Sequence, residues 1–163
     1  MSVPRPLLGP PPPPVPGCVG IVGVCASGKS TLERGLSRLG YNARQCGQEH
    51  SYIPDMWRRL TRPEVLIYLD ASPRVARLRR DMRLRGSDHA AQRERLAHAR
   101  QHCHVYIDTD AFSSRQVLEE AVRALGLLLP GFAGADATRP SAASVGLRGR
   151  PAVDDLTQRV ADL

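Results

Sequence analysis

One short stretch, GVCASGKST from Gly23 to Thr31, constrains the fold more than any other part of the chain. It closes a short apolar run, Cys18 to Gly23, whose β-branched residues are typical of a buried parallel strand. The residues after it have leucines at the spacing of one helix face, at positions 32, 36 and 39, and Gly40 then supplies a stop. The sequence therefore predicts a strand, a tight glycine loop and a helix.

Further strand and helix patterns alternate along the chain. We expect strands at 41–46, 64–70 and 104–108, and a short helix around Trp57. We also expect helices from Ser72-Pro73 to Gly86, from residue 87 or 88 to Gln101, and from a Ser113/Gln116 capping box to about Leu128. This alternation predicts an α/β fold of three layers, α/β/α, around a small parallel sheet of four or five strands.

The two ends of the chain differ in composition from the centre. Residues 1–17 are rich in proline, and the run Pro10 to Pro14 favours polyproline II. We expect a disordered arm there, with a ligand for a proline-binding partner protein as the alternative. Residues 130–163 are rich in Gly, Ala, Ser and Pro and are expected to be mostly disordered. The folded domain is therefore predicted at 18–129.

The composition also limits the surroundings of the protein. No apolar run reaches the length needed to cross a bilayer, and the arm lacks the apolar segment of a signal peptide. The four cysteines show no zinc-type spacing. We expect a cytoplasmic protein with reduced thiols and no membrane partner.

Lys29 is the single lysine among 23 basic residues. It completes the pattern G-x-x-x-x-G-K-[ST], in which backbone N–H groups cradle phosphate oxygens and a compact ammonium reaches the β- and γ-phosphates. A planar guanidinium fits such a nest poorly, which explains why lysine remains here. Ser30 is expected to bind Mg²⁺. The predicted phosphate-binding residues are Gly23, Ala26, Ser27, Gly28, Lys29, Ser30 and Thr31.

Several classes of nucleotide-binding protein are excluded by missing motifs. Without a second lysine the chain has no N-K-x-D or T-K-x-D for guanine, and VLIYLD is followed by Ala71 where motor ATPases place a glutamate. The chain resembles the small P-loop kinases, the nucleoside-monophosphate kinase-like group that includes shikimate, gluconate and adenylylsulfate kinases. GVCASGKST, VLIYLDASPRVARLRRDMR and HVYIDTDAFSSRQVLEEAVRALG carry this resemblance. It implies a P-loop NTPase fold, ATP with Mg²⁺, and phosphoryl transfer to a small-molecule acceptor. The interval before VLIYLD is shorter than in those kinases, so the acceptor-binding region is reduced.

Three carboxylates compete for the role of catalytic acid or base. Glu49 follows the second predicted strand and is the first candidate for a base or water-mediated Mg²⁺ ligand. Asp70 occupies the position of a Walker B aspartate and is the candidate metal ligand beside Ser30. Asp55 is the third candidate.

Arginines supply the excess positive charge. Residues 74–100 hold nine arginines, three acidic residues and no aromatic residue. Arg77 and Arg80 are the candidates for stabilising the moving phosphoryl group, because a spacing of three puts both on one helix face. Two alternatives stay open: a nucleotide-binding module that hydrolyses little, and a nucleic-acid-associated NTPase using this segment. The absence of aromatics disfavours the second.

Overall fold

A four-stranded, all-parallel sheet forms the centre of the computed structural model, which describes residues 9–79 and 86–131. The strands lie in the order β2-β1-β3-β4. Their bounds are β1 Val15–Gly23, β2 Asn42–Gln45, β3 Pro63–Asp70 and β4 Val105–Asp108. The parallel pairing confirms the predicted α/β class, with four strands in the sheet. The chain turns from β1 to β2 on one side and later to β3 on the other, so the winding direction reverses between β1 and β3.

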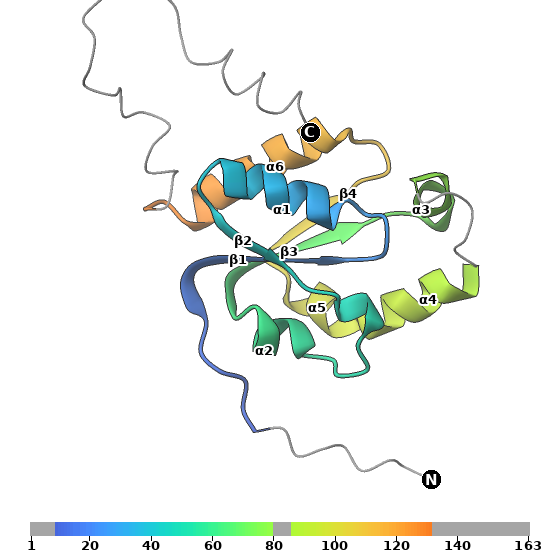
Figure 1. Ribbon diagram of the computed structural model, residues 1–163, viewed down its shortest axis with the longest axis horizontal. Helices are drawn as coiled ribbons and strands as arrows, with labels where there is room; N and C mark the ends of the chain where they lie inside the picture. The colour runs from blue at the N-terminus through green and yellow to red at the C-terminus, as the bar shows by residue number, and fades with distance from the viewer. Residues whose placement is uncertain (1–8, 80–85, 132–163) are drawn as a thin grey trace, which may run out of the picture.

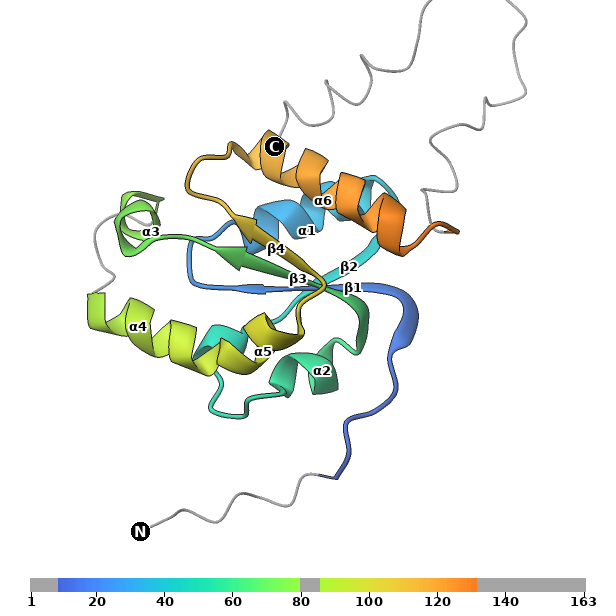
Figure 2. The same ribbon diagram turned by 180° about the vertical axis from the view of Figure 1, so that it is seen from behind.

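Helices cover both faces of this sheet (Figure 1). One face carries α1 (Lys29–Arg38) and α6 (Ser114–Leu128), and the other carries α2 (Met56–Leu60), α4 (Gly86–Arg95) and α5 (Ala97–His102), as the reverse view in Figure 2 also shows. The short helix α3 (Pro73–Arg79) follows β3, and a 3-10 turn, η1 (Gln48–His50), follows β2. The arrangement has the three layers that the sequence predicts.

Strand β3 shows why these strands are apolar throughout. Val65, Ile67 and Leu69 pack in the core under α1 and α6, while Leu66 and Tyr68 pack in the second core on the opposite face. All five side chains are buried. A strand that is covered on both faces has no polar side, so its sequence reads as a continuous apolar run.

Local signals set the ends of two helices as predicted. Gly40 adopts a left-handed φ of 89°, and its N–H donates to Ser37 O while the Tyr41 N–H donates to Leu36 O. This is the Schellman arrangement, which satisfies the last carbonyls of α1. At α6, the Ser113 hydroxyl and the Gln116 side chain form the predicted capping box.

Three predicted boundaries were wrong. The first strand begins at Val15 rather than at Cys18, because the Val15 N–H donates to Arg62 O and the Gly17 N–H donates to Glu64 Oε2. The predicted arm therefore contributes three residues to the sheet. The single helix expected from residue 87 or 88 to Gln101 is two helices, α4 and α5, which meet at Leu96. Gly86, the predicted end of the preceding helix, is instead the first residue of α4.

The prolines before β1 lie against the domain. Arg62 Nε donates to Pro13 O at 2.9 Å, and residues 11–14 line a hollow together with Trp57 and His102. Other predictions fall on residues 1–8, 80–85 and 132–163, which lie outside the described residues; these include Arg80 and most of the expected tail. Within the described ranges, no helix combines the length and apolar character that crossing a membrane requires.

Candidate functional site

The loop between β1 and α1 is shaped by glycine at two positions. A Cβ on Gly23 would collide with the carbonyl oxygen of Leu69, so β1 and β3 can approach this closely only with glycine there. Gly28 is the N-cap of α1 in a left-handed conformation, with φ of 98°. The first N–H groups of α1 have no carbonyl partner within the helix, and they begin at this loop. The loop and the helix dipole together form a site suited to an anion.

Lys29 is held at the end of β1. Its side chain is nine-tenths buried, and Nζ donates to Gly23 O at 2.9 Å and to Val24 O at 3.0 Å. The third partner is Glu49 Oε1, which lies 2.6 Å from Nζ. The ammonium is thus fixed between two backbone carbonyls and a carboxylate, at the start of the loop.

Glu49 reaches Lys29 from η1, the turn after β2. The residue is 3% exposed, and Oε2 has no hydrogen-bond partner among the described residues. Gln48 fixes the turn, because its amide donates to Ile53 O at 2.8 Å and accepts from the Trp57 N–H at 2.9 Å. Arg95 adds a hydrogen bond of 3.1 Å to Glu49 O. A buried carboxylate with one free oxygen therefore faces the loop.

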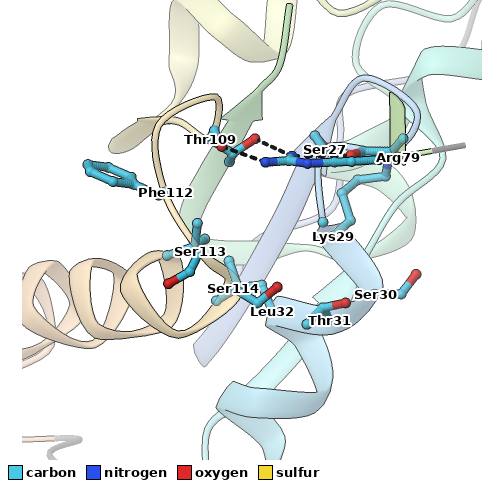
Figure 3. A pocket seen from close by; sticks show the side chains of 13 residues that line it. Ser27, Lys29, Ser30, Thr31, Leu32, Arg79, Thr109, Phe112, Ser113 and Ser114 are labelled. Atoms are coloured by element: carbon cyan, nitrogen blue, oxygen red, sulfur yellow. Dashed lines mark hydrogen bonds between the residues drawn. The ribbon is translucent and has the colours of Figure 1, made fainter. Parts of the chain in front are cut away.

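A cavity of about 490 Å³ opens beside the loop (Figure 3). One wall is residues 26–32, and the opposite wall comes from Arg79 and from the segment between β4 and α6. Figure 3 shows Phe112, Ser113 and Ser114 on that far wall, across from Ser30 and Thr31. Six of the seven predicted phosphate-binding residues line this cavity in a continuous run, from Ala26 to Thr31, whereas Gly23 does not line it.

Arg79 spans the two walls of the cavity. Its guanidinium donates to Thr109 Oγ1 at 2.9 Å and to Thr109 O at 2.6 Å, and it reaches Ala26 O at 3.4 Å. Arg77, which the sequence suggests together with Arg80 for stabilising the phosphoryl group, is exposed on α3 and does not line the cavity. Arg79 reaches the cavity through Thr109, the residue after β4. Its role could be predicted only if the position of β4 beside β3 were known.

Asp70 lies at the end of β3 and is already engaged. Its Oδ1 accepts from the Ala71 N–H, while Oδ2 accepts from Arg93 at 3.0 Å and from the Tyr106 hydroxyl at 2.8 Å. Burial and the hydrogen bond to Asp70 raise the pKa of Tyr106 to about 12, so the phenol keeps its proton at neutral pH. Both carboxylate oxygens have partners, which contrasts with Glu49.

The two other sequence candidates, Asp55 and Ser30, each have a side-chain partner of their own. Asp55, the N-cap residue of α2, is paired with Arg59 at 3.0 Å, and this hydrogen bond lowers the pKa of the Asp55 carboxyl. Ser30 Oγ donates to Gln45 Oε1 at 3.1 Å. Gln92 is not among the residues that the sequence suggests, yet its Oε1 accepts from the Cys25 N–H at 2.7 Å and fixes the loop from α4. Gln92 lies in a polar helix, and nothing in the surrounding sequence predicts that it contacts the loop.

No family model matches the chain, and no curated protein sequence matches it.

Proposed function

We propose that this chain is a P-loop nucleotide-binding protein of the small-kinase type, which transfers a phosphoryl group from Mg²⁺-ATP to a small acceptor. The observation that carries the proposal is the setting of Lys29. Its ammonium is buried at the start of a glycine loop, at the carboxyl end of β1 and beside a cavity. In open α/β sheets, ligands bind at this end and at the point where the winding reverses, here between β1 and β3.

ATP phosphates fit the donors that this loop offers. Lys29 would turn from Glu49 to the phosphates, the N–H groups at the start of α1 would cradle them, and Ser30 would hold the metal ion. Mg²⁺ would neutralise charge on the phosphoryl group that moves. Arg79, at the opposite wall, is the described arginine best placed to stabilise that charge.

Glu49 is the better candidate of the three acids. Once Lys29 engages phosphate, the Glu49 carboxylate loses its cationic partner and can orient an acceptor hydroxyl or a metal-bound water. Asp70 would first have to release Arg93 and Tyr106. The geometry therefore favours Glu49 as the functional carboxylate.

The saturated Asp70 also supports a second candidate function. In this chain the Walker B position has a structural role and the acceptor region is short. Such a chain could bind nucleotide without hydrolysing it and signal its bound state to a partner. The nucleic-acid alternative gains less support. Four arginines of the 74–100 segment form intramolecular contacts: Arg79 with Thr109, Arg93 with Asp70, Arg95 with Tyr52 and Arg100 with Tyr106.

Calorimetric titration of the full chain with Mg²⁺-ATP tests the phosphate site. We expect Lys29→Met to weaken binding about 10–100-fold, the size of a lost charge-assisted hydrogen bond. Lys29→Arg keeps a cation beside Glu49, and it should also weaken binding of Mg²⁺-ATP because the guanidinium does not fit the loop. Arg34→Met, which removes an exposed charge from the same helix, is the matched control and should bind as wild type does. Equal binding by wild type and both Lys29 variants would refute the site.

ADP release across pools of hydroxyl-bearing and phosphate-bearing metabolites then separates the two candidate functions. Release that depends on one pool and is lost in Glu49→Gln supports the kinase. Binding of Mg²⁺-ATP without release in any pool supports the binding module.

A further inference from the structure

Three side chains with metal-binding atoms meet behind the glycine loop. Cys25 Sγ lies 3.6 Å from His50 Nε2 and 4.0 Å from Glu49 Oε1, and the latter two atoms are 3.8 Å apart. Cys25 belongs to the loop, whereas Glu49 and His50 belong to η1. The group is therefore assembled by the fold, from residues that are 24 and 25 positions apart.

The triangle of donor atoms matches the face of a tetrahedral zinc site. With zinc–ligand bonds of about 2.0–2.3 Å, the edges of an ideal tetrahedron are about 3.6 Å for sulfur to nitrogen and about 3.4–3.6 Å for the other two pairs. The observed sulfur–nitrogen edge equals this value, and the two edges to Glu49 are a few tenths of an ångström longer. Small rotations of the side chains would close that difference.

Burial and backbone hydrogen bonds hold the side chains of this group in place. Cys25 and Glu49 are buried, and Glu49 Oε2 is an unpartnered carboxylate oxygen among the described residues. The backbone is fixed on both sides, by Gln92 at Cys25 and by Arg95 at Glu49. The His50 side chain is 65% exposed and provides an entry path from solvent.

We propose that Cys25, Glu49 and His50 form a binding site for one borderline-soft divalent cation of the Zn²⁺ class. Sulfur and imidazole donors select such an ion over Mg²⁺, which prefers oxygen ligands throughout. Binding displaces the Cys25 thiol proton to solvent and changes no oxidation state. Three protein ligands leave the fourth position to water or to an exchangeable ligand.

The site shares Glu49 Oε1 with Lys29. That oxygen lies 2.6 Å from the ammonium, so a divalent cation bound there must compete with Lys29 for the carboxylate and repel its charge. The metal site and the setting of the loop lysine are therefore antagonistic. Removal of the lysine charge should tighten metal binding, and this expectation does not depend on any nucleotide.

Titrations of the reduced full chain with Zn²⁺ against a competing chromophoric chelator, and with Co²⁺ in the spectrophotometer, test the proposal. We expect one Zn²⁺ per chain and a near-ultraviolet thiolate-to-cobalt charge-transfer band. Cys25→Ser should abolish the band, and Cys25→Ser and His50→Gln should each weaken Zn²⁺ binding at least about tenfold. Cys103→Ser and His102→Gln are the matched controls, a partly exposed thiol and an exposed imidazole away from the loop, and should bind as wild type does.

Lys29→Met supplies an independent readout of where the metal lies. Zn²⁺ should bind this variant more tightly than wild type, because Glu49 no longer has its cationic partner. Zn²⁺ binding that persists unchanged in both Cys25→Ser and His50→Gln, or that is lost only in the His102 control, would overturn the proposal. Loss of the cobalt band in Cys103→Ser instead of Cys25→Ser would overturn it as well.

Discussion

Trp57, the single tryptophan of the chain, is hydrogen-bonded to a histidine. Its indole N–H donates to His98 Nδ1 at 3.2 Å, which requires that nitrogen to carry no proton. Burial, followed by the neighbouring His102 and Arg58, lowers the pKa of His98 below its usual 6.5, and Asp55 opposes this only in part. At the residue scale, the protonation of His98 is therefore coupled to the fluorescence of Trp57.

Trp57 fluorescence should therefore titrate with a midpoint below pH 6.5. Protonation of His98 turns Nδ1 into a donor and breaks the bond to the indole. Between the folded pKa and 6.5 the unfolded chain binds more protons, so the free energy of unfolding falls as the pH is lowered through that window. His98→Gln should remove the fluorescence transition, and His102→Gln should move it upward. A midpoint at or above 6.5 in wild type would contradict this assignment.

The Lys29–Glu49 pair makes a second prediction at this scale. Both residues are buried, at 9% and 3% exposure, so removal of one partner leaves a charge unpaired in the interior. Lys29→Met should lower the free energy of unfolding by about 3–5 kcal/mol, and the double variant Lys29→Met/Glu49→Gln should recover part of that loss. Urea denaturation of the two single variants and the double variant measures the coupling. Additive losses would show that the pair is not a stabilising unit.

Two glycines in regular elements differ in the space that a side chain would find there. Gly23 ends β1 where β3 passes at close range, and a methyl group there would meet the Leu69 carbonyl. Gly126 lies inside α6, and a Cβ added to it would meet nothing within 4 Å. At the scale of the element, one glycine is demanded by packing and the other only lowers helix propensity.

Gly23→Ala should destabilise the domain by about 1–3 kcal/mol through overpacking between β1 and β3. Gly126→Ala should stabilise it by about 0.5–1 kcal/mol, because alanine loses less backbone entropy in a helix. Thermal and urea unfolding of the two variants give the comparison. If both substitutions shifted stability in the same direction, the close approach of the two strands would be in question.

The whole molecule depends on two cores that a thin sheet separates. The larger core joins α1 and α6 to the sheet, and Leu125 lies fully buried in it. Its neighbour on the same helix, Leu127, is 75% exposed. The domain is small, so the loss of one core contact is a large part of its total stability.

Leu125→Ala should cost about 2–5 kcal/mol, since it removes buried methyl groups and leaves a cavity. Leu127→Ala, the matched control on α6, should stay within about 0.5 kcal/mol of wild type. Chemical denaturation monitored by circular dichroism distinguishes the two. A large loss in the control would mean that α6 has a second buried face.

Local physical chemistry made part of this structure predictable from the sequence. The apolar runs of β1 and β3, the leucine stripe and Gly40 stop of α1, and the capping box of α6 depend on residues within one or two turns of each other. The cap of α3 is of the same kind, because Ser72 Oγ accepts from the Val75 N–H. These features follow from backbone sterics and short-range hydrogen bonds, which a sequence window contains.

Only the tertiary structure decided which side chains meet at the loop. The sequence ranks Glu49 before Asp70 and Asp55 without showing their partners; in the structure Glu49 alone among the three pairs with Lys29, while the other two are bound to arginines. The contacts of Gln92 and Arg79 with the loop likewise join residues 67 and 53 positions apart. Such contacts depend on the order of the strands and on how whole helices pack. The spacing and the chemistry of the local sequence determine neither the strand order nor the helix packing.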